Sequence, residues 1–268
     1  MSHNMGHVFS KFVVMIVPSM SNLEICNALF ADRPKLEMRV ETLKPRIAKQ
    51  FKKEGKFPAW KWDEYTHQKS HNRYLISFYA PTPAYAGNPK VNYVAFMEED
   101  HQRIVIQWGC WGYQKPGCHE KIATRYIGYF SGHFFSRYRE RLWKNVNISF
   151  NELVSRYFSR NIITIPLELN EDIQRNYKKY GELAKYAFKV QEGTCFIRHW
   201  DEGDETTVDQ KDSDFVSVVL YLTFVNDGMM SDTQSQAINK EENKYIQSLF
   251  KEVMNEPFFR RHIAMLNN

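Results

Sequence analysis

The segment Val216–Leu222, with the sequence VSVVLYL, constrains the fold more than any other part of the chain. It is apolar enough to be a central strand, because a strand covered on both faces carries an almost continuous apolar run. A second strand is predicted over Cys195–Trp200, and the acidic loop 201–214 joins it to the strand predicted over Phe215–Val225. The pattern therefore predicts two paired strands in this region.

Three further strands are predicted in the N-terminal half. Arg73–Ala80 is one of them. Val91–Met97 and Arg103–Trp108 flank the polar tip Glu98–Gln102, which is typical of a β-hairpin with a longer loop. The segment 109–117 is rich in glycine and aromatic residues, so we interpret it as a turn region.

Helix signals surround these strands. Ser21–Glu24 has the spacing of a capping box and predicts a helix from Asn22 to about Ala31. Alternation over 36–40 indicates a short strand, and a second helix is predicted over 45–55 because Pro45 suits a first helical turn. The segment 55–71 reads as aromatic and irregular.

Helical patterns are also predicted in the C-terminal half. One runs from His119 to Lys144, with a break near Gly128 or Ser131-Gly132. The others cover Asn151–Arg160, capped by Ser149 or Asn151, then 169–189, and finally the amphipathic segment Asn239–Asn255.

These elements together predict an α+β fold with antiparallel strands and segregated helices. The turn region before residue 118 is the best candidate boundary between an N-terminal half, residues 1–117, and a C-terminal half, residues 118–268. One continuous domain is the alternative. The sequence leaves the oligomeric state open.

Composition indicates a globular protein with a core of its own. Of the 268 residues, 43% are hydrophobic and 15% aromatic, so the chain needs no disulfide framework to fold. Its four cysteines, Cys26, Cys110, Cys118 and Cys195, are expected to be buried free thiols. No apolar run is long enough for a membrane span. The run Phe12–Val17 is short for a signal peptide, so we expect a cytoplasmic protein, with an atypical secretion signal as the alternative.

Charge is distributed unevenly along the chain. Residues 44–56 hold six cations and one acid, and residues 121–160 hold eight Lys and Arg and two acids. Residues 192–214 are acidic, with eight acids and two cations. Clustered positive charge indicates an anionic partner. A solvated helix face is the competing interpretation.

The segment 131–141 carries the chemistry that points most directly to function. In a helix, His133, Arg137 and Arg141 share one face, while Phe134, Phe135, Tyr138 and Leu142 lie on the other. An imidazole can act as general acid or base, and arginines bind phosphate oxygens. This set would suit metal-independent RNA cleavage by an adjacent 2′-hydroxyl. An amphipathic helix with a polar outer face is the alternative.

The His133-x3-Arg137-x3-Arg141 helix, followed by a second helix and antiparallel strands, resembles RelE-related toxin-like domains of the barnase–colicin–RelE fold group. The resemblance covers roughly residues 122–225 and implies an RNA-binding or ribonuclease role, with these three residues as candidate site residues. The chain departs from the group in its length and in the insertion 162–190 between the helix pair and the strands.

Aromatic residues and cations also alternate over 125–160, a combination that can stack on unpaired bases and follow a nucleic-acid backbone. Aromatic residues at helical spacing can equally form a core. The candidate nucleic-acid-binding residues are Lys49, Lys52, Lys53, Tyr138, Arg139 and Lys144.

No metal site or cofactor is predicted. Cys110, Cys118, His119 and His133 lack a usual zinc spacing, and Ala123 stands where an H-E-x-x-H motif needs its second histidine. Glycine-rich nucleotide motifs and a nucleophile elbow are absent from the sequence.

The leading hypothesis is an intracellular RNA-binding protein, with metal-independent endoribonuclease activity as its enzymatic form. The alternative is a non-enzymatic module whose partner is another protein. A third interpretation is a small-ligand pocket lined by Trp108, Trp111 and Tyr113.

Overall fold

A computed structural model describes residues 14–114, 121–144, 146–168, 186–203 and 215–255. It confirms the predicted α+β class. Over these residues, nine strands form a sheet in the order β1-β2-β3-β4-β5-β9-β8-β7-β6. Every strand pair with a described register is antiparallel. No helix in the described ranges is both long and apolar enough to cross a membrane.

The chain divides into two compact units, each assembled from separate segments. The first unit contains residues 1–132, 148–159 and 200–219, and the second contains 133–147, 160–199 and 220–268. The predicted boundary between residues 117 and 118 lies outside the described residues.

The first unit begins with α1 (Asn22–Phe51), whose start confirms the predicted capping box at Ser21 and Glu24. The predicted end near Ala31, the strand over 36–40 and the separate helix over 45–55 were wrong, because α1 continues through Pro34 and Pro45. An apolar stripe runs along the whole helix and is buried; it includes Leu29, Leu36, Val40, Leu43, Ile47 and Phe51. The burial of this stripe outweighs the cost of two internal prolines, each worth about 3 kcal/mol.

The β-hairpin was predicted correctly, but its connection is tighter than expected. The strands β3 (Lys90–Glu99) and β4 (Gln102–Gln114) pair up to Glu99 and Gln102. Asp100 and His101 alone form the connection, with φ of 46° and 61°. Two consecutive residues with positive φ are the signature of a type I′ turn, which matches the twist of the flanking strands.

Strand β2 (Arg73–Ala80) confirms its prediction, whereas two neighbouring segments were misassigned. The segment expected to be irregular contains β1 (Ala59–Thr66), and the segment expected to be helical from His119 contains β5 (Lys121–Phe130). β1 pairs with β2 along its full length, and β5 pairs with β4. Pairing with a neighbouring strand decided both cases, because strand preference depends on the cross-strand partners more than on local sequence.

The predicted turn was also wrong over residues 109–114, since β4 continues as a strand to Gln114, and residues 115–117 lie outside the described residues. Gly109 lies opposite Tyr126 of β5. A Cβ atom at Gly109 would stand 2.8 Å from Tyr126 Cε1, so the glycine lets the aromatic ring lie over the strand.

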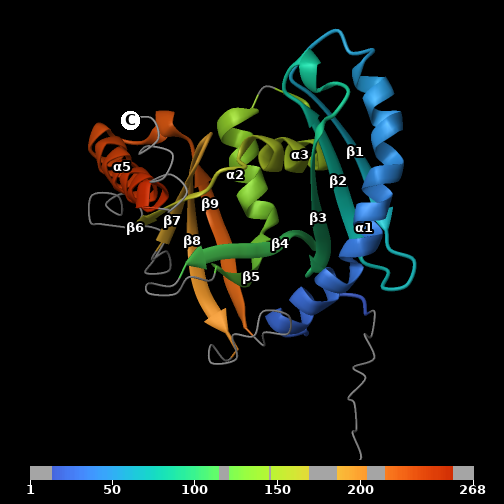
Figure 1. The fold of residues 1–268 in the computed structure, drawn as a ribbon, viewed down its shortest axis with the longest axis horizontal. Coiled ribbons are helices and arrows are strands. Elements are labelled where there is room, and N and C mark those ends of the chain that lie inside the picture. The colour runs from blue at the N-terminus through green and yellow to red at the C-terminus, as the bar shows by residue number, and fades with distance from the viewer. Residues whose placement is uncertain (1–13, 115–120, 145, 169–185, 204–214, 256–268) are drawn as a thin grey trace, which may run out of the picture. The chain divides into compact units, whose positions relative to one another are not determined.

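Helices cover both faces of this part of the sheet. Tyr74, Ile76 and Phe78 of β2 belong to the core with α1, which runs alongside β1 and β2 in Figure 1. The alternate residues face α3 (Phe150–Arg160), where Ser77 Oγ and Ser155 Oγ lie 2.7 Å apart. β2 is therefore buried on both faces, which accounts for its nearly continuous apolar sequence.

The helix predicted over Asn151–Arg160 is confirmed as α3. Ser149 is its cap, since its Oγ accepts the backbone N–H of Glu152 at 3.2 Å. Of the helix predicted over His119–Lys144, only α2 (Gly132–Leu142) is helical, because residues 121–130 form β5.

The second unit contains most of α2 and the remaining elements. Those elements are β6 (Ile165–Glu168), β7 (Tyr186–Val190), β8 (Gly193–Glu202), β9 (Val216–Val225), η3 (Asp227–Met229) and α5 (Asp232–Asn255), and β8 and β9 each also contribute residues to the first unit. The two predicted strands are confirmed as β8 and β9, and the terminal helix as α5. The helix predicted over 169–189 was wrong at its end, which is β7, and the rest lies outside the described residues.

Candidate nucleic-acid interface

The outer face of α2 presents two of the three predicted catalytic residues to solvent. His133 is exposed in the first turn, and Arg137 follows one turn later with 37% of its side chain exposed. Arg137 Nη1 donates a hydrogen bond to Glu140 Oε2 at 2.8 Å. Arg141 is half-buried. A phosphate could therefore approach His133 directly but would have to replace Glu140 at Arg137.

The inner face of α2 belongs to the core. Phe134, Phe135 and Tyr138 are buried, and the Phe134 and Tyr138 rings pack against Phe224 with centroids 6.3 and 5.1 Å away. Tyr138 therefore cannot stack on a base, as its proposed nucleic-acid role would require. Phe130, Tyr157 and Phe158 are also buried, so the core interpretation of these aromatic residues replaces the stacking one.

Tyr138 is held by a carboxylate in the second unit. Its hydroxyl donates to Glu192 Oε2 at 2.5 Å, and Asn161 Nδ2 donates to the same oxygen at 3.0 Å. Arg160 Nε forms an ion pair with Glu192 Oε1 at 2.5 Å. Burial, and secondarily the negative charge of Glu192, raise the pKa of Tyr138 well above its usual value. This Glu192 network ties α2 and the end of α3 to the turn between β7 and β8.

The C-terminal end of α1 carries the predicted basic residues of the first unit. Lys49 lies in the last turn, Lys52 is the C-cap, and Lys53 and Lys56 follow the helix; all four are exposed. None of these four lysines forms an ion pair with any residue that the structure describes. They are called the lysine cluster below.

Other cations around this helix are neutralised. Asp63 accepts both Arg39 at 2.9 Å and Arg46 at 3.3 Å, and Glu54 pairs with Lys61. Glu54 is the one acid of the basic segment, so its engagement with Lys61 leaves the lysine cluster without a compensating carboxylate. The result is a local excess of positive charge at one end of the first unit.

The remaining two predicted residues lie on or just after α2. Arg139 is half-buried, and Lys144 is exposed after the end of the helix. They belong to the second unit, and the lysine cluster belongs to the first.

A buried polar cluster in the first unit was missed by sequence reasoning. Asp32 is 0% exposed, and its Oδ2 accepts hydrogen bonds from Ser70 Oγ at 2.5 Å, Tyr74 Oη at 2.7 Å and Asn72 Nδ2 at 2.9 Å. Its Oδ1 has no hydrogen-bond partner among the described residues. The signal was present in the sequence: Asp32 occupies a position of the apolar stripe between Leu29 and Leu36.

The Asp32 cluster contains a Ser, a His and an Asp, but it is not a catalytic triad. The Ser70 hydroxyl donates to Asp32, and His67 Nδ1 accepts the backbone N–H of Ser70 at 3.1 Å. His67, Ser70 and Asp32 are all buried, so a substrate could not reach them. The cluster instead fixes the turn between β1 and β2. It also holds the N-terminal segment, because Ile16 N donates to Asn72 Oδ1 at 2.8 Å.

The three described cysteines differ in their exposure to solvent. Cys26 and Cys195 are buried as predicted, whereas Cys110 on β4 is exposed, contrary to prediction. Burial raises the pKa of the Cys26 thiol to about 12. Cys118 lies outside the described residues.

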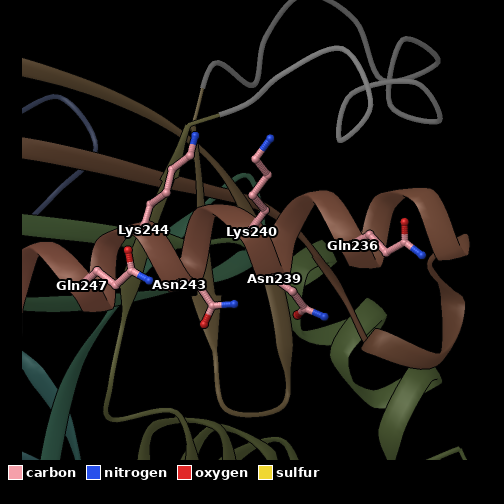
Figure 2. A pocket seen from close by; sticks show the side chains of 6 residues that line it. All are labelled: Gln236, Asn239, Lys240, Asn243, Lys244 and Gln247. Atoms are coloured by element: carbon pink, nitrogen blue, oxygen red, sulfur yellow. The ribbon is translucent and has the colours of Figure 1, made fainter.

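The structure describes the side chain of one of the three residues of the predicted small-ligand pocket. Trp108 is buried between Tyr74 and Tyr93 and belongs to the core, whereas the side chains of Trp111 and Tyr113 lie outside the described part of the structure. An open hollow of about 460 Å³ lies along α5. Figure 2 shows the side chains that line it: Gln236, Asn239, Lys240, Asn243, Lys244 and Gln247. Within the described part of the chain, no group of His, Cys, Asp or Glu could hold a metal ion.

Comparison with known proteins identifies no relative. No family model matches the chain, and neither a curated protein nor a solved structure matches it. The resemblance to RelE-related domains therefore stays a prediction, and the functional argument depends on the geometry of the residues themselves.

Proposed function

We propose that this protein binds RNA through the lysine cluster at the C-terminal end of α1. The observation that supports the proposal is a contrast between the C-terminal half of α1 and the residues where it ends: Arg39, Lys44 and Arg46 each have a carboxylate partner, whereas Lys49, Lys52 and Lys53 are exposed without one among the described residues. Lysines that neutralise phosphates release condensed counterions, which drives binding and makes it depend on salt.

The lysines also suit their place on the helix. Cations in a last turn interact favourably with the carbonyl end of the helix dipole. One or two lysines are enough for that interaction with the helix dipole. The cluster has four, and Glu54 is already paired with Lys61, so an excess positive charge remains that an anionic partner can neutralise.

The test compares two triple charge reversals that change the net charge equally. Lys49→Glu/Lys52→Glu/Lys53→Glu alters the cluster, and Lys35→Glu/Lys69→Glu/Lys240→Glu alters exposed lysines elsewhere. Affinity for a fluorescent RNA oligonucleotide would be measured by anisotropy over a salt titration. The cluster variant should bind roughly 10- to 50-fold more weakly near 0.15 M salt and show a salt slope smaller by about 2. Equal losses in the two variants would contradict a local site.

A second candidate function is metal-independent RNA cleavage at α2, and the exposure of His133 beside Arg137 favours it. His133 would accept the proton of a 2′-hydroxyl as that oxygen attacks the adjacent phosphorus, and the 5′-oxygen would leave with a proton from water. Arg137, released from Glu140, would hold the phosphate oxygens, with Arg141 behind it.

Cleavage would be assayed in EDTA with wild type, His133→Ala and His101→Ala, since His101 is an exposed histidine on the β3–β4 turn. Loss of cleavage in His133→Ala alone would support the enzymatic form. Retained cleavage in His133→Ala, or none by the wild type over a broad RNA panel, would leave RNA binding as the function.

A further inference from the structure

Three segments of the first unit meet at the end of the sheet where α1 ends. Ala59, the first residue of β1, pairs with Ala80, the last residue of β2, and Tyr79 pairs with Lys90 at the start of β3. The ion pair between Glu54 and Lys61 joins the segment after α1 to β1. The loop 81–89 therefore leaves the sheet at the same end as the lysine cluster, as the top of Figure 1 shows.

This loop has a defined structure. It contains Pro81, Pro83 and Pro89, and the short helix η1 (Pro83–Tyr85) lies at its centre. Tyr85 N donates to Thr82 O at 3.0 Å, and Asn88 N donates to Tyr85 O at 3.2 Å. Prolines and local hydrogen bonds limit the conformations of the loop, so the position of Tyr85 costs little entropy to maintain.

Tyr85 is exposed to solvent and has a cation over one face of its ring, which leaves the opposite face for an unpaired base. The residue is 40% exposed, and Lys90 Nζ lies 5.6 Å from the ring centroid. Lys90 itself is exposed. This combination of a fixed aromatic ring and lysines is the arrangement that proteins use to bind single-stranded nucleic acid, with bases on the rings and phosphates on the cations.

We propose that Tyr85, Lys90 and the lysine cluster form one site for single-stranded RNA, in which an unpaired base stacks on the Tyr85 ring. The inference rests on the proposed function and adds the class of RNA that is bound. In a duplex the bases are already stacked and their faces are covered, so Tyr85 would discriminate in favour of single strands. The lysines would contribute to the affinity for both forms.

The experiment measures single-stranded and duplex RNA of the same sequence with wild type, Tyr85→Ala and Tyr85→Phe. The matched control is Tyr186→Ala, because Tyr186 is 45% exposed on β7 of the second unit. Tyr85→Ala should weaken single-strand binding roughly 5- to 100-fold and leave duplex affinity unchanged. Tyr85→Phe keeps the ring and should bind like wild type, as should Tyr186→Ala.

The salt slope separates the failure of this inference from the failure of the proposed function. Tyr85→Ala removes no phosphate contact, so its slope should equal that of wild type. Unchanged single-strand affinity in Tyr85→Ala, alongside a loss in the lysine-cluster variant, would overturn the stacking role and leave RNA binding standing. Equal losses for single strands and duplexes would overturn it too. If the wild type bound neither RNA form, both proposals would fail.

Discussion

The two units each bury a carboxylate, and they stabilise it in different ways. In the first unit, Asp32 Oδ2 accepts hydrogen bonds from two hydroxyls and an amide, and His67 Nδ1 lies 3.5 Å from Oδ1, but no lysine or arginine pairs with it among the described residues. In the second, Glu192 has a guanidinium partner, Arg160, besides a hydroxyl and an amide. The Glu192 side chain is 8% exposed and that of Arg160 is 31% exposed, so solvent reaches this network, whereas Asp32 is fully enclosed.

The difference indicates how each unit depends on its carboxylate. A buried carboxylate without a lysine or arginine partner is stabilised by several oriented hydrogen-bond donors. All of these donors must be in place, so the arrangement tolerates little change. A charge pair at the edge of the core can be rehydrated when one partner is removed. We therefore expect the Asp32 cluster to matter more for stability than the Glu192 network.

The largest effect is expected for Asp32→Ala, which leaves three buried donors without their acceptor. The free energy of unfolding should fall by about 3–5 kcal/mol, measured by urea denaturation. Asp32→Asn keeps the shape and one acceptor oxygen, so it should lose less. If Asp32→Ala lowered the free energy of unfolding by less than about 1 kcal/mol, the cluster could be rehydrated, and the expected difference between the two carboxylates would be contradicted.

A smaller effect is expected for Glu192→Ala, about 2–3 kcal/mol, because Arg160 can turn toward water while the buried Tyr138 hydroxyl and the buried Asn161 amide lose their acceptor. Glu140→Ala is the control, since Glu140 is also paired with an arginine but lies at the surface. Its loss should stay below about 0.5 kcal/mol after solvent screening. A Glu192 variant more destabilised than Asp32→Ala would reverse the ranking.

The smallest effect concerns pH, and here the two networks should behave alike. Burial is the main reason that the pKa values of Tyr74 and Tyr138 are raised in the folded protein. Above the ordinary tyrosine pKa of about 10, the unfolded chain loses protons that the folded chain keeps, so stability falls as pH rises. Each tyrosine should contribute up to about 1.4 kcal/mol per pH unit between about pH 10 and 11.

Stability measured against pH for Tyr74→Phe and Tyr138→Phe tests this expectation. Each variant should show a shallower alkaline decline than wild type, even though it is less stable at neutral pH. An unchanged decline in one variant would mean that the corresponding hydroxyl ionises in the folded state, and would sharpen the contrast between the two networks.

Local patterns predicted the elements whose signals agree with their surroundings. The capping box at Ser21, the β-hairpin, α3 and the apolar strand β9 all appear close to where the sequence places them. In each case the residues that define the element lie within it or next to it. Predictions failed for β1 and β5, whose strand state depends on partners elsewhere in the chain.

The candidate site also has features that follow from the local sequence and features that depend on the tertiary structure. The exposure of Lys49 follows from helical spacing, because the apolar stripe of α1 leaves it on the solvent side, and Lys52 and Lys53 are exposed where the helix ends. Whether a carboxylate neutralises a cation depends on residues brought together by folding, such as Asp63 with Arg39 and Arg46. The burial of Tyr138, which removes it from the site, likewise required the packing of α2.

The sequence by itself determined the α+β class, the capping box that begins α1 and the concentration of positive charge where α1 ends, because these depend on composition and on patterns within one segment. Tertiary structure decided that α1 passes through two prolines, that Asp32 is enclosed by the β1–β2 turn and that Tyr85 lies at the same end as the lysine cluster. Long-range contacts supply the free energy for such arrangements. The sequence pattern within one segment does not identify the distant residues that it contacts.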